Sequence, residues 1–573
     1  MAAVRRGGTP EQSAVPPTVE AGPLGPPTGS RPPADSGKAA TRRRLLASAA
    51  VVLAAVLLFV AYLRVSRTYQ ENSDSANILL MSWDMLHGNV LLHGWNLSDV
   101  SFITTELPQY AMLVAVLGLH TDTAHVAAAM TYTLVLVFAV LLAAGPRDRG
   151  SREQRQRTGA AWPRMALTAA VMIAPQLGVG VFVLLLSVGH IGTAVPLMLT
   201  WLVIDRTASR PRWFVPVIVG VLLTWVLVAD PLVLVVGIAP LVLVCMVRVI
   251  AAVIGAGGRM GTLQARWYEV SLAVAAILAY GLADVVNRLL RAGGGFFLHP
   301  LGYQLAPVHT WPKHAWVTGE GLLALFGAKP QGPAAQMAFA LVHLAGVALV
   351  AWAMWRVARR FLSWPDLVGQ VLLVAIVLNV VVYVPSTLAD ATDLNAREFA
   401  VVLPFGAVLA GRTLATHLRG TAALRPGTAR WRLALASVLA VGYAASLGYA
   451  VAQPSAPPAN AQLAAFLAAH HLTDGIGGYW QSSIVTVESD GAVAVRAVWA
   501  DTLRPYPWES KDSWYDPGSQ RATFLVTDSQ TGYFNYWQPS PAALAAYGPP
   551  AHTYRFGPYT VLVWDKNLLA GPG

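Results

Sequence analysis

The chain has 573 residues, of which 55% are apolar and only 12% are charged, and its mean hydropathy is +0.51. A soluble protein carries roughly 25% charged residues, so these values exclude a disordered chain, a collagen and a coiled coil and predict a polytopic membrane protein. The net charge of +11 comes from arginines in short clusters between apolar runs. That pattern is typical of membrane topology, and we expect no nucleic acid among the partners.

The N-terminal segment, residues 1–44, is rich in Pro and Gly and ends in three arginines. It cannot bury enough apolar surface to offset the entropy of ordering, so we expect a disordered cytoplasmic tail. Residues 45–63 follow without a charged side chain. This run is longer than the apolar core of a secretory signal, and it predicts an uncleaved first span with its cytoplasmic end first.

Further apolar runs predict about 11 transmembrane helices in a domain over residues 45–453. The run 165–204 has no Asp, Glu, Lys or Arg and predicts two spans with a tight turn near Gly189 and His190. The other predicted spans are 123–144, 213–229, 231–247, 268–287, 334–355, 367–385, 399–410 and 433–451.

The loops between these runs alternate in charge. Every second loop is rich in arginine, as in 147–164 and 412–432, whereas the intervening loops hold most of the carboxylates. By the positive-inside bias the arginine-rich loops are cytoplasmic. A cytoplasmic N-terminus and an odd number of spans then place the C-terminus outside the plasma membrane.

Three predicted external segments are larger than a connection requires. The first is 64–122, where the apolar stretch 107–119 is too short to span and suits an interfacial helix. The second is 288–333. The third is the soluble tail 454–573, which predicts a small α/β or mostly-β domain with strands at 482–488, 493–498, 523–527 and 559–564.

Soluble catalytic motifs are absent from the sequence. It contains no P-loop, no Gly-x-Ser-x-Gly, no His-Glu-x-x-His and no Cys-x-x-Cys, so ATP hydrolysis, serine-esterase chemistry and structural zinc are set aside. The candidate chemistry lies just outside span one, where Asp74 begins an expected helix and Glu106 precedes the interfacial helix. The alternative is that both are ordinary solvated loop carboxylates.

Several short motifs resemble the GT-C superfamily of membrane glycosyltransferases. Residues 74–89, from Asp74 through Gly88-Asn89, resemble the family's first external loop, and Asp230-Pro231 resembles a short external turn with an acidic residue. Arg397-Glu398-Phe399 with Pro404 resembles a later external pattern, and residues 478–486 resemble an element of bacterial members. The resemblance implies a GT-C-like fold and a polyprenyl-phosphate sugar donor. The chain lacks the paired acid Asp-x-Asp at residue 74, which leaves open whether a divalent metal takes part.

Chemistry leads to the same class of reaction. Nucleotide sugars are absent outside the membrane, so an external transfer needs a lipid-linked donor, whose phosphate leaves as a stable anion. A carboxylate can act as general base on the acceptor hydroxyl while cations stabilise the phosphate. Asp74 and Glu106 are the candidate catalytic residues. The candidate phosphate-binding residues are Arg397, Lys313 and Arg291.

Three alternatives stay open at these positions. Arg397 could instead form an ordinary ion pair with Asp393 or Glu398. Asp230, a candidate active-site or metal-associated carboxylate, either faces a cavity or a partner, or caps the next span at Pro231. His299, His309 and His314 could invite a metal, but their spacing fits no helical pair, and we assign no metal ligands.

We expect a glycosyltransferase that moves a sugar from a polyprenyl-phosphate donor to an extracytoplasmic glycan, lipid or protein of the cell envelope. The main competing hypothesis is a secondary transporter or flippase of lipid-linked envelope precursors. A transporter should carry ionisable residues at the midplane of several spans. Here the acidic residues gather at the outer ends instead, which favours an outward-facing reaction chamber. A non-catalytic scaffold or sensor would leave the large external loops unexplained.

Overall fold

The computed structural model describes residues 35–146, 161–186, 188–257, 261–389, 392–420, 426–532 and 534–572. By its internal contacts the chain divides into two units, residues 1–54 and residues 55–573. The first contains the beginning of helix α1 (Asp35–Ser66), and the features below belong to the second. Residues 35–44 are helical, which corrects the expected tail over that stretch, because the good helix formers Lys38, Ala39 and Ala40 extend α1 backwards. Residues 1–34 lie outside the described part.

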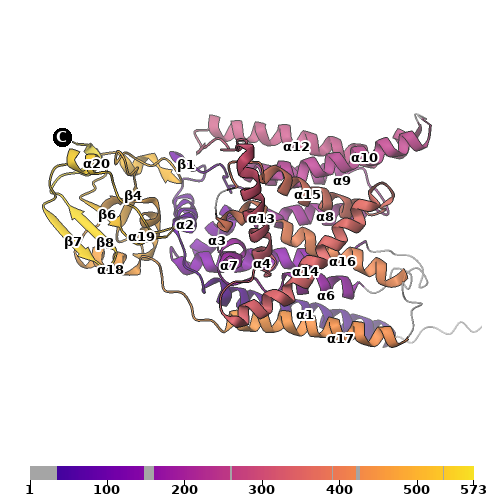
Figure 1. Ribbon diagram of the computed structural model, residues 1–573. Coiled ribbons are helices and arrows are strands. Elements are labelled where there is room, and N and C mark those ends of the chain that lie inside the picture. The colour runs from indigo at the N-terminus through magenta and orange to yellow at the C-terminus, as the bar shows by residue number, and fades with distance from the viewer. Residues whose placement is uncertain are drawn as a thin grey trace, which may run out of the picture. The chain divides into compact units, whose positions relative to one another are not determined.

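The predicted polytopic helical domain is confirmed, and outside 165–204 each predicted span overlaps a helix (Figure 1). For the span predicted at 231–247, a turn and a short π-helix, Leu234–Ile238, precede the α-helix, which begins at Ala239. Among the described residues, five helices are long and apolar enough to cross a membrane, or six if the pair 393–399 and 402–414, bent by 59°, is one span. The full count of 11 stays a prediction. The helices are α4 (Thr121–Ala143), α6 (Trp162–Met172), α7 (Val179–Leu185), α8 (Ala194–Thr207), α9 (Val215–Ala229), α10 (Ala239–Gly255), α12 (Trp267–Ala292), α14 (Ala334–Arg359), α15 (Leu367–Tyr383), α16 (Val402–Gly420) and α17 (Pro426–Val451).

The run 165–204 differs from the prediction. Three helices, α6, α7 and α8, replace the two expected spans. The first break contains Pro175, which has no backbone N–H to continue a helix. It also contains Gly178, which immediately precedes α7 and has a φ of 83°, a conformation that favours glycine. The second break holds His190 and Thr193, so the interruption brings polar side chains into the candidate site described below.

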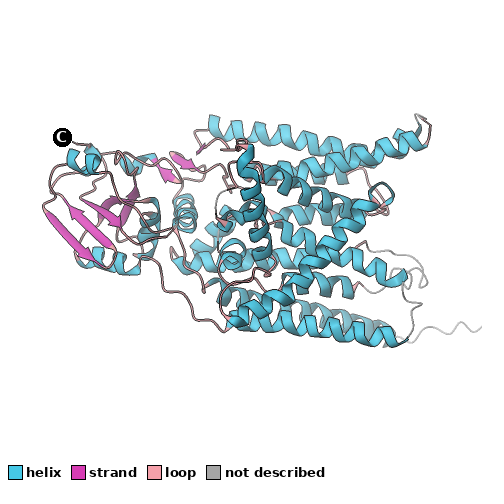
Figure 2. Cartoon of the chain, in the orientation of Figure 1, coloured by secondary structure: helices cyan, strands magenta, loops and turns pink. Residues whose placement is uncertain are grey.

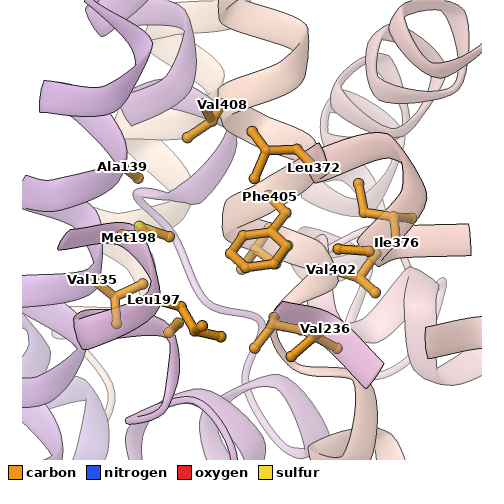
Figure 3. Close-up of a cluster of buried hydrophobic side chains, with 14 of the residues drawn as sticks. Val135, Ala139, Leu197, Met198, Val236, Leu372, Ile376, Val402, Phe405 and Val408 are labelled. Carbon is orange, nitrogen blue, oxygen red and sulfur yellow. The ribbon is translucent and has the colours of Figure 1, made fainter. Parts of the chain in front are cut away.

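The helices pack around a buried apolar core (Figure 3). Phe405 of α16 is fully buried there. Its neighbours are Leu197 of α8, Ile376 of α15 and Val236, which lies in the short π-helix Leu234–Ile238. Close helix contacts rely on small residues, since lipid supplies no hydrophobic force between helices. At Gly220 of α9, for example, an added Cβ would lie 3.4 Å from the carbonyl oxygen of Ala275 in α12.

The three predicted external segments meet in one small sheet. Strand β1 (Trp95–Leu97) pairs in parallel with β2 (Phe297–Leu298) and antiparallel with β5 (Ser510–Lys511). The same segments form α2 (Ser73–Leu86), α3 (Glu106–Leu117) and α13 (Trp311–Leu325). Helix α3 confirms the expected short helix ahead of span two.

The C-terminal segment forms a second, five-stranded sheet of order β4-β3-β6-β8-β7, which together with the small sheet holds the strands seen in Figure 2. Strands β4 (Ala494–Ala497), β6 (Phe524–Asp528) and β8 (Tyr559–Val563) confirm three predictions, and β3 (Asp474–Gly477) and β7 (His552–Phe556) were not predicted. Residues 483–488 form a helix, α19, instead of the expected strand. Ile484, Val485 and Val487 favour a strand locally, but burial against α2 and β4 overrides that propensity.

Candidate active site

Asp74 lies in the first turn of α2 and is held there by local structure. The side chain of Asn72 accepts hydrogen bonds from the backbone N–H groups of Asp74 (3.0 Å) and Ser75 (3.3 Å), which caps the helix. A carboxylate is favoured at this end of a helix dipole. Asp74 keeps 14% of its side chain exposed, so a small substrate group can reach it.

Arg397 contacts Asp74 although 323 residues separate them in the sequence. It lies on the 3-10 helix η4 (Asp393–Phe399), which Thr392 caps by accepting from the N–H of Leu394. Its Nη1 is 3.2 Å from Asp74 Oδ2. The sequence predicts Asp74 as a base and Arg397 as a phosphate ligand, without linking them. The structure brings the two side chains together. The carboxylate of Asp393, the other acid considered as a partner of Arg397, binds Lys329 at 2.5 Å.

Two residues of the C-terminal segment complete the surroundings of Asp74. The hydroxyl of Tyr479 lies 2.7 Å from Asp74 Oδ1 and 2.7 Å from Glu509 Oε2. Asn77, one turn after Asp74, donates to both Tyr479 Oη and Glu509 Oε2 at 3.1 Å. In the sequence, Tyr479 is notable only as part of the GT-C-like segment 478–486. Glu509 was not predicted as a site residue, because no local pattern marks it.

A second polar cluster surrounds Asp230. Its Oδ2 lies 2.8 Å from His190 Nδ1 and accepts from the hydroxyl of Thr193, while His190 Nε2 lies 3.0 Å from Glu398 Oε2. Asp230 Oδ1 also accepts from the N–H of Leu232 at 2.9 Å. Both alternatives for Asp230 therefore hold: it caps the turn after Pro231 and it faces polar partners.

The two clusters are neighbours because Arg397 and Glu398 are adjacent on η4. Arg397 Nε is 3.6 Å from Glu398 Oε1, so charged groups run without interruption from Asp74 to Asp230. Helix α13 holds η4 in place through a close approach, since a Cβ on Gly321 would lie 2.9 Å from the ring of Phe399. A larger residue at position 321 would push η4 and Arg397 out of position.

Glu106, the other candidate base, lies apart from Asp74. It is buried at the start of α3, and among the described residues neither of its carboxylate oxygens has a hydrogen-bond partner. Its Oε1 would lie 1.8 Å from a Cβ on Gly192. Glu106 is therefore packed against the break that carries His190 and Thr193, so it belongs with the Asp230 cluster.

The other two candidate phosphate ligands are exposed. Lys313 lies in the first turn of α13 and Arg291 in the last turn of α12. Within the described part of the chain, no hydrogen bond or ion pair joins either one to Asp74 or Asp230. Lys329, which was not predicted as a site residue, contacts η4 through Asp393.

Lys329 stands at the edge of a large apolar cavity. The cavity has a volume of about 830 Å³ and lies between α13, α14, α15 and α16. Its walls are almost entirely apolar side chains, and its two charged residues are Lys329 and Glu320, 3.8 Å apart. Because Lys329 also binds Asp393 of η4, the charged edge of the cavity is tied to the helix that carries Arg397.

Within the described residues, no group of three or more His, Cys, Asp and Glu side chains converges as metal ligands do. The acids near Asp74 and Asp230 already face Arg397, Tyr479 and His190. His299, from the histidine cluster, instead stacks on Trp508 with ring centroids 5.4 Å apart. The steps of the reaction proposed below therefore involve side chains alone.

Comparison with known proteins identifies the fold. Two crystal structures of ArnT from Cupriavidus metallidurans, one bound to undecaprenyl phosphate and one in the apo state, are similar with TM-scores of 0.52 and 0.51. The likeness covers 92% of this chain and 99% or 100% of ArnT, at 15% or 16% sequence identity. No family model and no curated protein matches the sequence. The chain thus shares its overall fold with ArnT.

Proposed function

We propose that the protein is a polyprenyl-phosphate-dependent membrane glycosyltransferase. The observation that carries the proposal is the pairing of a reachable carboxylate, Asp74, with a guanidinium, Arg397. Arg397 lies on a short helix that Asp393 joins to Lys329, and Lys329 lines an apolar cavity of about 830 Å³. Base, phosphate-binding cation and lipid-binding space are the three elements that transfer from a lipid-linked sugar requires. The chain's likeness to ArnT, which was solved with undecaprenyl phosphate, supports this assignment.

The donor is assigned to the cavity between α13 and α16. Its apolar walls suit a polyprenyl chain, whose transfer out of water is favourable by roughly 0.8 kcal/mol per buried CH₂. The phosphate would then lie at the charged edge, near Lys329 and Arg397. Arginine has five N–H donors in a fixed fork, so Arg397 can keep Asp74 in place and still donate to phosphate oxygens.

The reaction then follows from the chemistry of the groups. Asp74 takes the proton of the acceptor hydroxyl as its oxygen bonds to the anomeric carbon of the sugar. The bond between that carbon and the phosphate oxygen breaks, and the polyprenyl phosphate leaves with the bonding electron pair. Arg397 stabilises the charge that develops on the phosphate. His190 lies between Asp230 and Glu398 and contacts both, and Glu398 in turn contacts Arg397.

We infer that the acceptor is a glycan, lipid or protein of the cell envelope, outside the plasma membrane. The alternation of arginine-rich and acidic loops supports a cytoplasmic N-terminus, with Asp74 and the C-terminal domain outside. The domain from residue 454 supplies Tyr479 and Glu509 to the surroundings of Asp74. We propose that it also contributes to acceptor binding.

The test is an assay of the purified protein in lipid nanodiscs. A panel of radiolabelled polyprenyl-phosphate sugars is offered together with extracted envelope material, and Asp74→Asn is the matched inactive control. We expect label to move to the envelope fraction with the wild type only. If label stays on the lipid for every donor while the protein moves that lipid across vesicles, the protein is a flippase, and the transferase proposal is wrong.

A further inference from the structure

The hydroxyl of Tyr479 lies between two carboxyl groups that it cannot satisfy alone. Its oxygen is 2.7 Å from Asp74 Oδ1 and 2.7 Å from Glu509 Oε2. A phenol has one proton to donate, and an ionised carboxylate is an acceptor only. If both carboxylates were ionised, one of these short contacts would join two acceptors. The geometry therefore requires one more proton in this group of three residues.

Glu509 is held in this place by the backbone around it. It has a φ of 47°, in the left-handed region that non-glycine residues seldom occupy. Directly after it, Ser510 and Lys511 form β5 and pair with β1. Lys511 Nζ also binds Asp84 of α2 at 2.9 Å. A strained residue fixed from both strand and helix is a sign of a functional constraint.

The charges around Glu509 decide which carboxyl carries the proton. Arg397 lies 3.2 Å from Asp74. The charged groups that face Glu509 are Asp74 and Arg397, and its polar partners are Tyr479 and Asn77. Burial, followed by the negative charge of Asp74, raises the pKa of Glu509 to about 8. The extra proton thus belongs on Glu509 at neutral pH.

We propose that Glu509 is a protonated positioning residue whose carboxylic O–H donates to Tyr479 Oη, so that the Tyr479 hydroxyl is directed at Asp74. This rests on the proposed function, in which Asp74 is the general base. Tyr479 then fixes one oxygen of Asp74 and Arg397 fixes the other. Tyr479 of the C-terminal domain thereby sets the orientation of Asp74, which is 405 residues away in the sequence.

The proposal has a defined pH dependence. A carboxyl whose pKa is raised to about 8 is neutral below that pH and ionises above it. Once Glu509 ionises, it competes with Asp74 for the single Tyr479 proton, and a second negative charge lies beside the base. Turnover should therefore fall as the pH rises through about 8, while the pairing of Arg397 with Asp74 is retained.

Three variants separate this role from simple packing. Glu509→Gln keeps a neutral group that can donate to Tyr479, so it should retain most of the turnover and lose the fall near pH 8. Glu509→Ala and Tyr479→Phe should lower kcat about tenfold, the effect of roughly one lost hydrogen bond, with the KM for donor little changed. Asp565→Asn, an exposed acid of the same domain, is the control and should match the wild type.

A second measurement does not depend on turnover. The infrared difference spectrum between wild type and Glu509→Gln should contain the carbonyl band of a protonated carboxylic acid at pH 7, and the band should vanish above about pH 8. A missing band at pH 7, or a Gln variant as impaired as Ala, would overturn the proposal. If the band is present but no donor supports transfer, the transferase function is wrong and the shared proton stands.

Discussion

The hydroxyl of Tyr479 donates to Asp74 across 405 residues of chain, at a distance of 2.7 Å. This contact joins the first helix after span one to the C-terminal domain, and it defines the candidate base more sharply than the position of Asp74 in the sequence does. Asp74 is thus held from two directions, by Tyr479 on Oδ1 and by Arg397 on Oδ2. The predictions below test what that arrangement is for.

Replacing Asp74 with Asn should abolish most of the transfer. The amide has a similar shape but cannot accept the acceptor's proton, so we expect a loss of roughly a hundredfold or more in kcat. The Asn72 cap uses only the backbone of Asp74, so α2 should still form and the variant should still insert into the membrane. Near-wild-type turnover in a radiolabel transfer assay would remove Asp74 from the mechanism.

Arg397 should matter for the donor and not for the acceptor. Arg397→Lys keeps the charge but loses the bidentate fork, so we expect a clearly raised KM for the polyprenyl-phosphate sugar. Arg397→Ala should raise it further, with acceptor affinity little changed. If Arg397 is only a partly exposed ion pair, worth about 0–1 kcal/mol, the donor titrations of the three proteins will superimpose.

Filling the apolar cavity should exclude the long lipid. Ala351 of α14 lines the cavity, and Ala348 on the same helix is exposed without lining it. We expect Ala351→Trp to raise the KM for long polyprenyl donors at least tenfold and to spare a donor with a short isoprenoid chain. Ala348→Trp is the matched control. Equal effects of the two variants, in titrations with both donors, would rule out the cavity as the lipid site.

The C-terminal domain should be accessible from outside the cell. Protease added to right-side-out vesicles should cut within residues 454–573, because the loop charges predict an external position for this domain. Mass spectrometry of the released fragments locates the cuts, and inverted vesicles are the control. Cleavage in inverted vesicles alone would mean that the number of spans has the wrong parity.

Local sequence signals were enough to predict much of the membrane domain. An uncharged apolar run can satisfy its backbone in lipid only as a helix, so nearly every run found by composition is a helix in the structure. The failures lie where distant contacts oppose a local tendency. The run 165–204 breaks at Pro175 and Gly178, and residues 483–488 form a helix because they are buried between α2 and β4.

Hydropathy, loop charge and short motifs are properties of neighbouring residues, so they predict the class of protein, most of its helices and the candidates Asp74, Asp230 and Arg397. The fold of the chain settles which of these candidates lie together. It joined Asp74 to Arg397, separated Lys313 and Arg291 from them, and added Lys329, Tyr479 and Glu509. The physical reason is that hydrogen bonds and ion pairs act over about 3 Å in space, whatever the separation along the chain.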